Sequence, residues 1–147
     1  MPRDLYDHSN LVNSWMRQEA NGRTSKQLVE LFERAMVALW NRSHLTLGEI
    51  TLASIVDRVL YSAAEQFPPF QSLKVERSGI DFEKFRAQNA NFKGGELSEG
   101  MRFVITEFMV VIGNLTAEIL TPILHSELLR VTLKDSPAGA NPEEGTS

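Results

Sequence analysis

The stretch MRFVITEFMVVIGNLTAEILTPILHSELLRV, from Met101 to Val131, decides the fold of this chain. Its apolar residues recur at steps of three and four, which predicts a helix, and they cover more than one face. A single neighbouring helix cannot cover so wide an apolar surface. We therefore expect this segment to organise both the core of a helical domain and a homodimer interface. The candidates for that interface follow a four-three alternation: Ile105, Phe108, Ile112, Leu115 and Ile119.

The same stretch is too polar to cross a membrane. A spanning helix needs about 20 predominantly apolar residues, whereas only ten residues without charge separate Glu107 from Glu118. Placing these carboxylates and His125 in lipid would be unfavourable. We expect no membrane span, and we interpret the segment as a buried or interfacial helix.

The pair Gly113-Asn114 and Pro122 interrupt the stretch. An unbroken last helix would be about 50 Å long, which exceeds the diameter of a compact domain of this size. Pro122 removes one backbone hydrogen bond, and its ring crowds the carbonyl of Glu118. Either the helix kinks there, or Thr121 caps a new helix with Pro122 in its first turn. We expect a kink, because the apolar pattern continues across Pro122 without polar loop residues.

Three further long helices and one short helix are expected upstream from capping signals and apolar periodicity. The pair Pro68-Pro69 ends the third, because proline cannot donate a backbone hydrogen bond. Segment 70–96 has the least regular pattern, and the alternation over 73–76 is compatible with a short extended piece. The first expected helix is capped by Asp4 and reaches about Ala20. The second begins at the capping box Thr24 and Gln27 and reaches about Arg42, and the third begins at the capping box Thr46 and Glu49 and reaches about Phe67. A short helix is capped by Asp81 and runs from Phe82 to about Asn89, and Ser98 caps the last helix.

These elements predict an all-α fold in a single domain over residues 1–134. The expected architecture is a compact bundle of four main helices plus one short helix, with the last helix long and kinked near Pro122. With 42% hydrophobic residues in a chain of 147, a core can form. Residues 135–147 contain no large apolar side chain, so we expect a disordered tail there.

Charge and cysteine content exclude several classes of protein. The formal net charge of −4 argues against a nucleic-acid binder, which usually presents a basic face. The chain has no cysteine, so disulfides and thiolate chemistry are excluded. No apolar run opens the sequence, which favours a cytoplasmic location over secretion.

A stripe of polar residues runs along the decisive stretch. Glu107, Asn114, Glu118, Thr121 and His125 follow one another at steps of seven, four, three and four, which places them on one side of a continuous helix. This stripe has three possible interpretations. It is a functional site, it is the solvated side of a packed helix, or Asn114 and His125 lie at a dimer interface and fix its register. Because Pro122 divides the stripe, the site hypothesis is confined to three ligand or phosphoacceptor candidates: Glu118, Thr121 and His125.

Motifs for a metal, a cofactor or catalysis are missing from the sequence. No His-x-x-x-His or Glu-x-x-His pair occurs, and His8, His44 and His125 belong to different expected elements. There is also no G-x-S-x-G, P-loop or G-x-G-x-x-G motif. We therefore expect no metal, no cofactor and no enzymatic activity.

The segment from His125 to Arg130, HSELLR, resembles the His-Glu-Leu-Arg core of histidine-kinase dimerisation helices. It departs from that pattern because Ser126 separates the histidine from the glutamate, an extra leucine precedes the arginine, and Pro122 comes before the histidine rather than after it. The resemblance implies a phosphoacceptor role for His125. No glycine-rich ATP-binding motif is present, so the chain could not phosphorylate itself.

The function expected from the sequence is a non-enzymatic helical interaction or sensory module. We expect it to act in bacterial-type signal transduction, through homodimerisation and binding of a protein partner. The alternative is a histidine phosphotransfer-like or small-ligand-binding helical domain that uses His125. The sequence does not identify the partner, the ligand or the pathway.

Overall fold

The computed structural model describes residues 7–76, 78–91 and 95–133. The expected cap Asp4 and the expected disordered tail over 135–147 lie outside these residues. The fold is almost entirely helical, which confirms the all-α class. The elements in chain order are α2 (His8–Glu19), α3 (Ser25–Leu47), α4 (Glu49–Gln66), the 3₁₀ helix η1 (Pro68–Ser72), β1 (Lys74–Glu76), β2 (Gly79–Asp81), α5 (Glu83–Asn89), α6 (Glu96–Leu115) and α7 (Thr121–Arg130).

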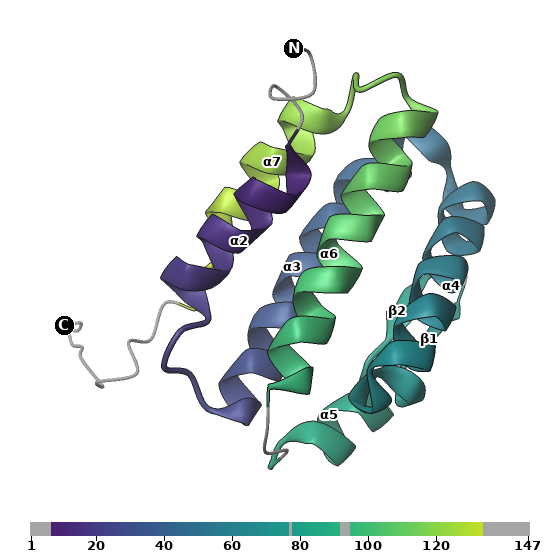
Figure 1. Cartoon of the computed structure of the whole chain (residues 1–147). Helices are drawn as coiled ribbons and strands as arrows, with labels where there is room; N and C mark the ends of the chain where they lie inside the picture. Colours follow the sequence, from purple (N-terminus) through teal and green to yellow (C-terminus); the bar gives the residue numbers. More distant parts are fainter. Residues whose placement is uncertain (1–6, 77, 92–94, 134–147) are drawn as a thin grey trace, which may run out of the picture.

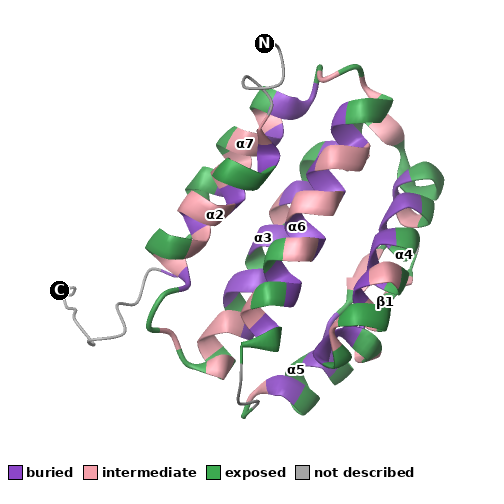
Figure 2. Ribbon diagram, viewed as in Figure 1, coloured by how far each residue is buried: buried purple, intermediate pink, exposed green. Residues whose placement is uncertain are grey.

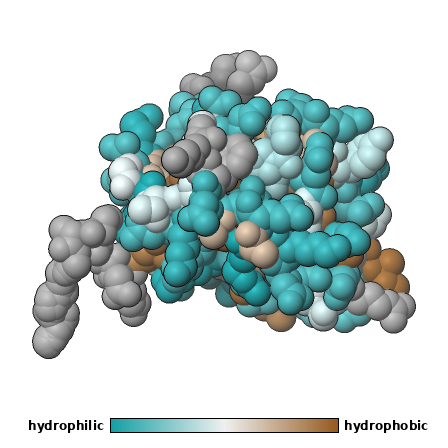
Figure 3. Space-filling model, turned by 90° about the horizontal axis from the view of Figure 1, so that it is seen from below, coloured by the Kyte–Doolittle hydropathy of each residue, from teal (hydrophilic) through white to brown (hydrophobic). Residues whose placement is uncertain are grey.

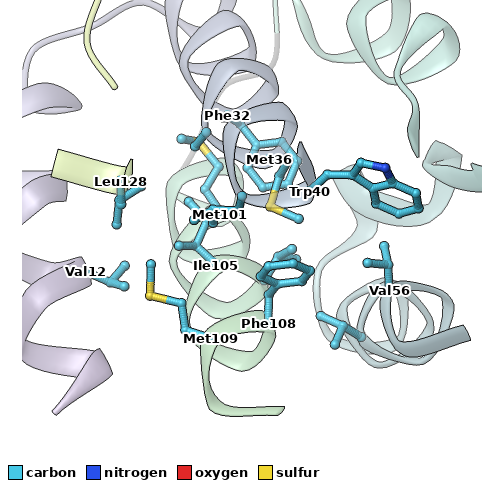
Figure 4. Packing of buried hydrophobic residues seen from close by; sticks show 14 of the residues in the cluster. Val12, Phe32, Met36, Trp40, Val56, Met101, Ile105, Phe108, Met109 and Leu128 are labelled. Atoms are coloured by element: carbon cyan, nitrogen blue, oxygen red, sulfur yellow. The ribbon is translucent and has the colours of Figure 1, made fainter. Parts of the chain in front are cut away.

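Helix α6 is the centre of the bundle. It packs against α2, α3, α4 and α7 (Figure 1), and in the close view its Met101, Ile105 and Phe108 lie among side chains of all four helices (Figure 4). Buried residues accordingly occur on several sides of α6, whereas α2 and α4 show exposed outer faces (Figure 2). The broad apolar surface of this segment is therefore used within the chain.

This packing corrects the expected dimer interface. Ile105, Phe108 and Ile112 are 0% exposed, because the other helices of the same chain cover them. These three side chains belong to the core and are not available to a partner. Leu115 and Ile119, at the end of the alternation, remain 58% and 72% exposed.

The last helical segment is two helices and not one kinked helix. Helix α6 ends at Leu115 and α7 begins at Thr121, with Pro122 in its first turn. The expected kink is wrong, and the alternative of a new helix at Thr121 is the arrangement found. The physical reason is a turn over residues 116–120 whose backbone cannot continue a helix.

Capping chemistry explains where α2 and α3 begin. The side chain of Asp7 accepts a hydrogen bond from the backbone N–H of Asn10 at 3.0 Å and starts α2. The expected capping box at the start of α3 is confirmed: the Gln27 N–H donates to Thr24 Oγ1 at 3.2 Å, and the Thr24 N–H donates to Gln27 Oε1 at 3.0 Å. Local side-chain chemistry is sufficient to fix these two starts.

Two other expected caps are wrong. Thr46 lies in the last turn of α3, and Gly48, with φ of 80°, separates α3 from α4. Only glycine adopts this left-handed conformation readily, so it decides the boundary more strongly than the Thr46 pattern. Helix α6 begins two residues before Ser98, whose hydroxyl donates to the carbonyl of Gly95 at 3.2 Å from inside the first turn.

The segment after Pro68-Pro69 covers one end of the core. The prolines end α4 as expected, and the extended piece at 74–76 pairs antiparallel with β2, with Val75 opposite Ile80. The buried side chain of Asn89 donates to the carbonyl of Pro69 at 3.0 Å and so ties α5 to η1. Across the described residues, no helix is long and apolar enough to span a membrane.

Candidate functional site

The turn between α6 and α7 has an unusual backbone. The N–H of Glu118 donates to the carbonyl of Gly113 at 2.7 Å, and the N–H of Ala117 donates to the carbonyl of Asn114 at 3.3 Å. This pair of bonds is the Schellman motif that ends many helices, in which glycine usually occupies the left-handed position. Here Ala117 and Glu118 have φ values of 52° and 65°. Left-handed conformations cost roughly 1–2 kcal/mol for each non-glycine residue, so the turn is strained.

The strained turn directs the Glu118 carboxylate toward the protein. Its Oε1 accepts a hydrogen bond from the hydroxyl of Thr121, the first residue of α7. A Cβ atom at position 113 would lie 2.6 Å from this oxygen, so the carboxylate fits because residue 113 is glycine. Strain of this kind often accompanies a functional group held in one orientation.

Two histidines from opposite ends of the chain meet beside this carboxylate. The Nδ1 of His8 lies 2.9 Å from the Nε2 of His125, and the ring planes are at 90°. The Nε2 of His8 lies 3.7 Å from the Oε1 of Glu118. Thr121, Glu118, His8 and His125 thus form a continuous polar chain, which we call the histidine clasp because it joins α2 to α7.

The carboxylate determines which ring nitrogens of the clasp carry hydrogen. Glu118 favours a proton on the Nε2 of His8, since that nitrogen faces it. The Nδ1 of neutral His8 is then an acceptor, and the Nε2–H of His125 donates to it. This assignment leaves Nδ1 of His125 as the nitrogen that can take up a further proton.

The clasp is an enclosed cluster. His8 is 6% and Thr121 is 1% exposed, and His125 is half-buried. Burial lowers the pKa of His8, and Glu118 and Asp7 oppose this effect without overcoming it. Burial and the neighbouring His8 lower the pKa of His125, against the opposing effect of Glu118. Both histidines are therefore predominantly neutral at pH 7.

The structure brings together the three candidates that the sequence singled out and adds His8, which was missed. His8, Val12 and Trp15 are spaced by four and three residues, and all three are buried on one side of α2. This spacing was the available signal that His8 faces inward. The partner of that face, 117 residues away, is not encoded in any local pattern.

The other members of the expected stripe lie elsewhere. Asn114 is exposed at the end of α6, and Glu107 lines a groove of about 330 Å³ between α4 and α6. Arg58 of α4 lines the same groove, and within the described part of the chain neither it nor Glu107 takes part in an ion pair. The apolar lining comes from Ile55, Val59, Val111 and the exposed Leu115.

The clasp does not have the geometry of a metal site. Glu118 faces one ring nitrogen of His8 and His125 faces the other, so the three groups do not converge on one point. No set of three or more His, Asp or Glu side chains over residues 7–76, 78–91 and 95–133 is placed to hold a metal ion.

The strain in the turn can be measured. Replacing Ala117 with glycine is expected to raise the free energy of unfolding by about 1 kcal/mol, because glycine relieves the left-handed conformation. The matched control is Ala87→Gly on the exposed face of α5, which should lower it by up to about 1 kcal/mol. Urea unfolding of both variants gives the comparison. Equal losses in the two variants would show that residue 117 is not strained.

Comparisons of the chain with protein-family models, with curated proteins and with solved structures gave no match.

Proposed function

We propose that this protein is a non-enzymatic helical interaction module for signal transduction, which responds to protons at the histidine clasp and associates with a second copy of itself. The observation that carries the proposal is the contact between His8 and His125, with Glu118 on the far side of His8. It places three ionisable groups in one enclosed cluster that joins the two ends of the described chain.

The clasp is suited to respond to acid. The Glu118 carboxylate compensates a first proton taken up by the pair, but a second proton would place two positive rings 2.9 Å apart at their facing nitrogens. Separation of α2 from α7 relieves this repulsion and hydrates both rings. Because α2 is the first described helix and packs mainly on α6 and α7, it can separate while the rest of the core stays intact.

The turn over residues 116–120 supports a link between the clasp and association. It carries Glu118 inward, and Ile119, the next residue, is 72% exposed. Leu115, at the end of α6, is 58% exposed beside the groove between α4 and α6. A displacement of Glu118 therefore moves apolar side chains that are available to a partner.

Charge favours a second copy as the occupant of that groove. Arg58 lies on the α4 wall and Glu107 on the α6 wall. In a dimer with twofold symmetry, each copy can place its Arg58 against Glu107 of the other copy and so form two equivalent ion pairs. Ile55, Val59 and Leu115 supply the apolar surface between these pairs.

The phosphoacceptor alternative has less support. The Nε2 of His125 already lies 2.9 Å from His8, so a phosphoryl donor would have to displace a buried neighbour to reach this nitrogen, which leaves only Nδ1 as an acceptor atom. A small-ligand site is disfavoured as well, since the polar atoms that face one another in the clasp are already paired.

The pH dependence of stability tests the proposed sensor. A histidine with a pKa below its unperturbed 6.5 binds fewer protons in the folded than in the unfolded chain. Its contribution to the free energy of unfolding is thus complete above pH 6.5 and is lost as the pH falls below that value. We expect wild-type stability, measured by urea unfolding, to fall between about pH 7 and about pH 5, and amide exchange in α2 to accelerate beyond its intrinsic pH dependence.

The variant His8→Gln should lose a large part of this pH dependence, because the buried pair is gone. His44→Gln, a half-exposed histidine of α3, is the matched control and should retain it. Histidine titration by NMR gives a direct measurement. If His8 and His125 both titrate at or above the unperturbed value, the sensor proposal is wrong.

A further inference from the structure

A small pocket lies between α3 and the β-hairpin. Its volume is about 110 Å³, and α3 forms one wall, while β2, the turn before it and the start of α5 form the other. We call it the Trp40 pocket, because the indole of Trp40 lines it. It shares no residue with the clasp or with the groove between α4 and α6.

Apolar and neutral side chains form the walls of the Trp40 pocket. The face of the molecule shown in Figure 3 is mostly hydrophilic, and apolar side chains appear on it only in small patches. In the pocket they make up most of the lining, through Met36, Val37, Ile80 and Phe82. Asn41 and Ser78 add two uncharged polar groups, and none of the described residues that line the pocket is charged. An ion would lose its hydration here without gaining a counter-charge from these walls, which favours a neutral ligand.

The indole N–H of Trp40 is a hydrogen-bond donor that lacks an acceptor. Trp40 is only 6% exposed, yet no described residue accepts a hydrogen bond from it. The other tryptophan, Trp15, donates to the carbonyl of Val131 at 3.0 Å. Because a buried indole usually has such a partner, the unpaired N–H of Trp40 indicates that an acceptor can come from outside the chain.

This donor is not sealed inside the protein. In the part of the chain that the structure describes, the fully enclosed polar atoms without a partner are the hydroxyl oxygens of Ser43, Ser72 and Thr106. The nitrogen of Trp40 is not among them, so it keeps access to the exterior. In the close view the indole extends from α3 to one side of the labelled core residues (Figure 4). A ligand in the pocket that this indole lines can therefore reach the N–H.

The size of the pocket limits what can enter it. Since an apolar cavity of about 150 Å³ holds benzene, a pocket of about 110 Å³ with an open mouth takes a body about as large as one six-membered ring. Val37, which is 45% exposed, and Asn41 also line a wider concave surface of about 630 Å³ on α3. A longer ligand can extend from the pocket onto that surface.

We propose that the Trp40 pocket binds a small neutral molecule with a compact aliphatic body and a carbonyl oxygen. The aliphatic body covers Met36, Ile80 and Phe82, which is favourable because apolar surface is removed from water. The carbonyl oxygen accepts the hydrogen bond of the Trp40 N–H and so supplies the partner that this buried donor lacks. The inference is independent of the proton response and of the groove dimer, because it uses none of their residues.

Titration of the full chain with cyclohexanone, followed by NMR of the two indole N–H signals, tests the proposal. We expect the Trp40 signal to move downfield saturably and its exchange with water to slow. The Trp15 signal is the internal control and should not move, because its N–H is already bonded to Val131. The variant Trp40→Phe assigns the two signals. The proposal is overturned if both signals move alike, or if neither shows saturable binding up to about 10 mM probe.

A second probe tests the role of the carbonyl. Methylenecyclohexane has nearly the same shape as cyclohexanone, but a CH₂ group replaces the oxygen. It should bind roughly fivefold more weakly, because the indole N–H stays unpaired in its complex. Equal affinity for the two probes would show that the pocket does not select a hydrogen-bond acceptor, and the proposed ligand class would be wrong.

A variant at the mouth of the pocket tests its location. Val37→Phe should weaken cyclohexanone binding by at least about tenfold, because the larger ring occupies space that the ligand needs. Leu45→Phe is the matched control, since Leu45 is a 78% exposed residue of α3 that does not line the pocket. It should bind the probe as the wild type does. If Val37→Phe also binds as the wild type does, the probe binds elsewhere and the proposal is overturned.

Discussion

Replacing Gly100 with alanine is expected to lower the free energy of unfolding by about 2 kcal/mol, even after the gain of about 1 kcal/mol from the better helix propensity of alanine. A Cβ atom at this position of α6 would lie 2.2 Å from Cε1 of Phe70. No real side chain tolerates that distance, so either the Phe70 ring or the α6 backbone must move.

The Phe70 ring cannot retreat easily. It is 0% exposed, and it packs against Phe32 and Phe85 with ring centroids at 5.4 and 5.1 Å. Because interiors are close-packed, a shift of this ring disturbs the whole aromatic cluster that joins η1, α3 and α5.

Urea unfolding measures the effect, and Gly95→Ala is the matched control. No atom lies within 4 Å of a Cβ at position 95, and its φ is negative. We expect a change of no more than about 1 kcal/mol in this control, since glycine and alanine differ modestly at a helix N-cap. If Gly100→Ala is as stable as Gly95→Ala, then α6 and η1 are not in close contact at Gly100 and Phe70.

Charge reversal in the groove between α4 and α6 is expected to weaken association of two copies of the chain strongly. In the proposed twofold dimer, Arg58→Glu places two glutamates together at each of two equivalent contacts, and Glu107→Arg places two arginines together. Like-charge contacts of this kind disfavour binding by several kcal/mol, so each variant alone is expected to be monomeric at concentrations where the wild type is a dimer.

A mixture of the two variants should restore the dimer. One copy then carries glutamates at positions 58 and 107 and the other carries arginines at both, so each contact pairs opposite charges. Sedimentation velocity of the separate and mixed samples measures the masses, and added salt should weaken the mixed species. Lys84→Glu on α5, a reversal far from the groove, is the control and should associate as the wild type does.

A wild-type chain that stays monomeric at the highest attainable concentration would contradict the groove dimer. A mixture that remains monomeric while the wild type dimerises would place the interface elsewhere. Neither result affects the proton response of the clasp, which is measured on His8 and His125 within one chain.

The parts of the fold that could be predicted are those encoded by neighbouring residues. The Thr24 capping box and the stop at Pro68 act within one turn of helix, so the sequence is sufficient for them. The break before α7 depends on left-handed conformations at Ala117 and Glu118, residue types that rarely adopt them. No composition rule anticipates such a turn, and the sequence-based expectation of a kink was wrong for that reason.

The sequence pattern pointed to three residues that do lie together in the structure, but part of the reasoning behind it was incorrect. The spacing of Glu118, Thr121 and His125 suggested one face of a continuous helix, whereas Glu118 precedes the helix and reaches Thr121 through the turn. His8 completes the cluster from the other end of the chain, and only tertiary packing brings it there. Ile105, Phe108 and Ile112 were expected at a dimer interface and are buried in the core instead. Apolar periodicity alone does not distinguish a core from an interface.

The indole of Trp15 gives this protein an optical reporter of its own. Trp15 is 1% exposed, and its Nε1–H donates to the carbonyl of Val131 at 3.0 Å, just after α7. The chain has two tryptophans, and replacing Trp40 with phenylalanine leaves Trp15 as the single emitter. When α2 leaves α7, this indole exchanges a buried carbonyl for water and its fluorescence shifts to longer wavelength. The docking of α2 can thus be followed in dilute solution, in real time and without a label.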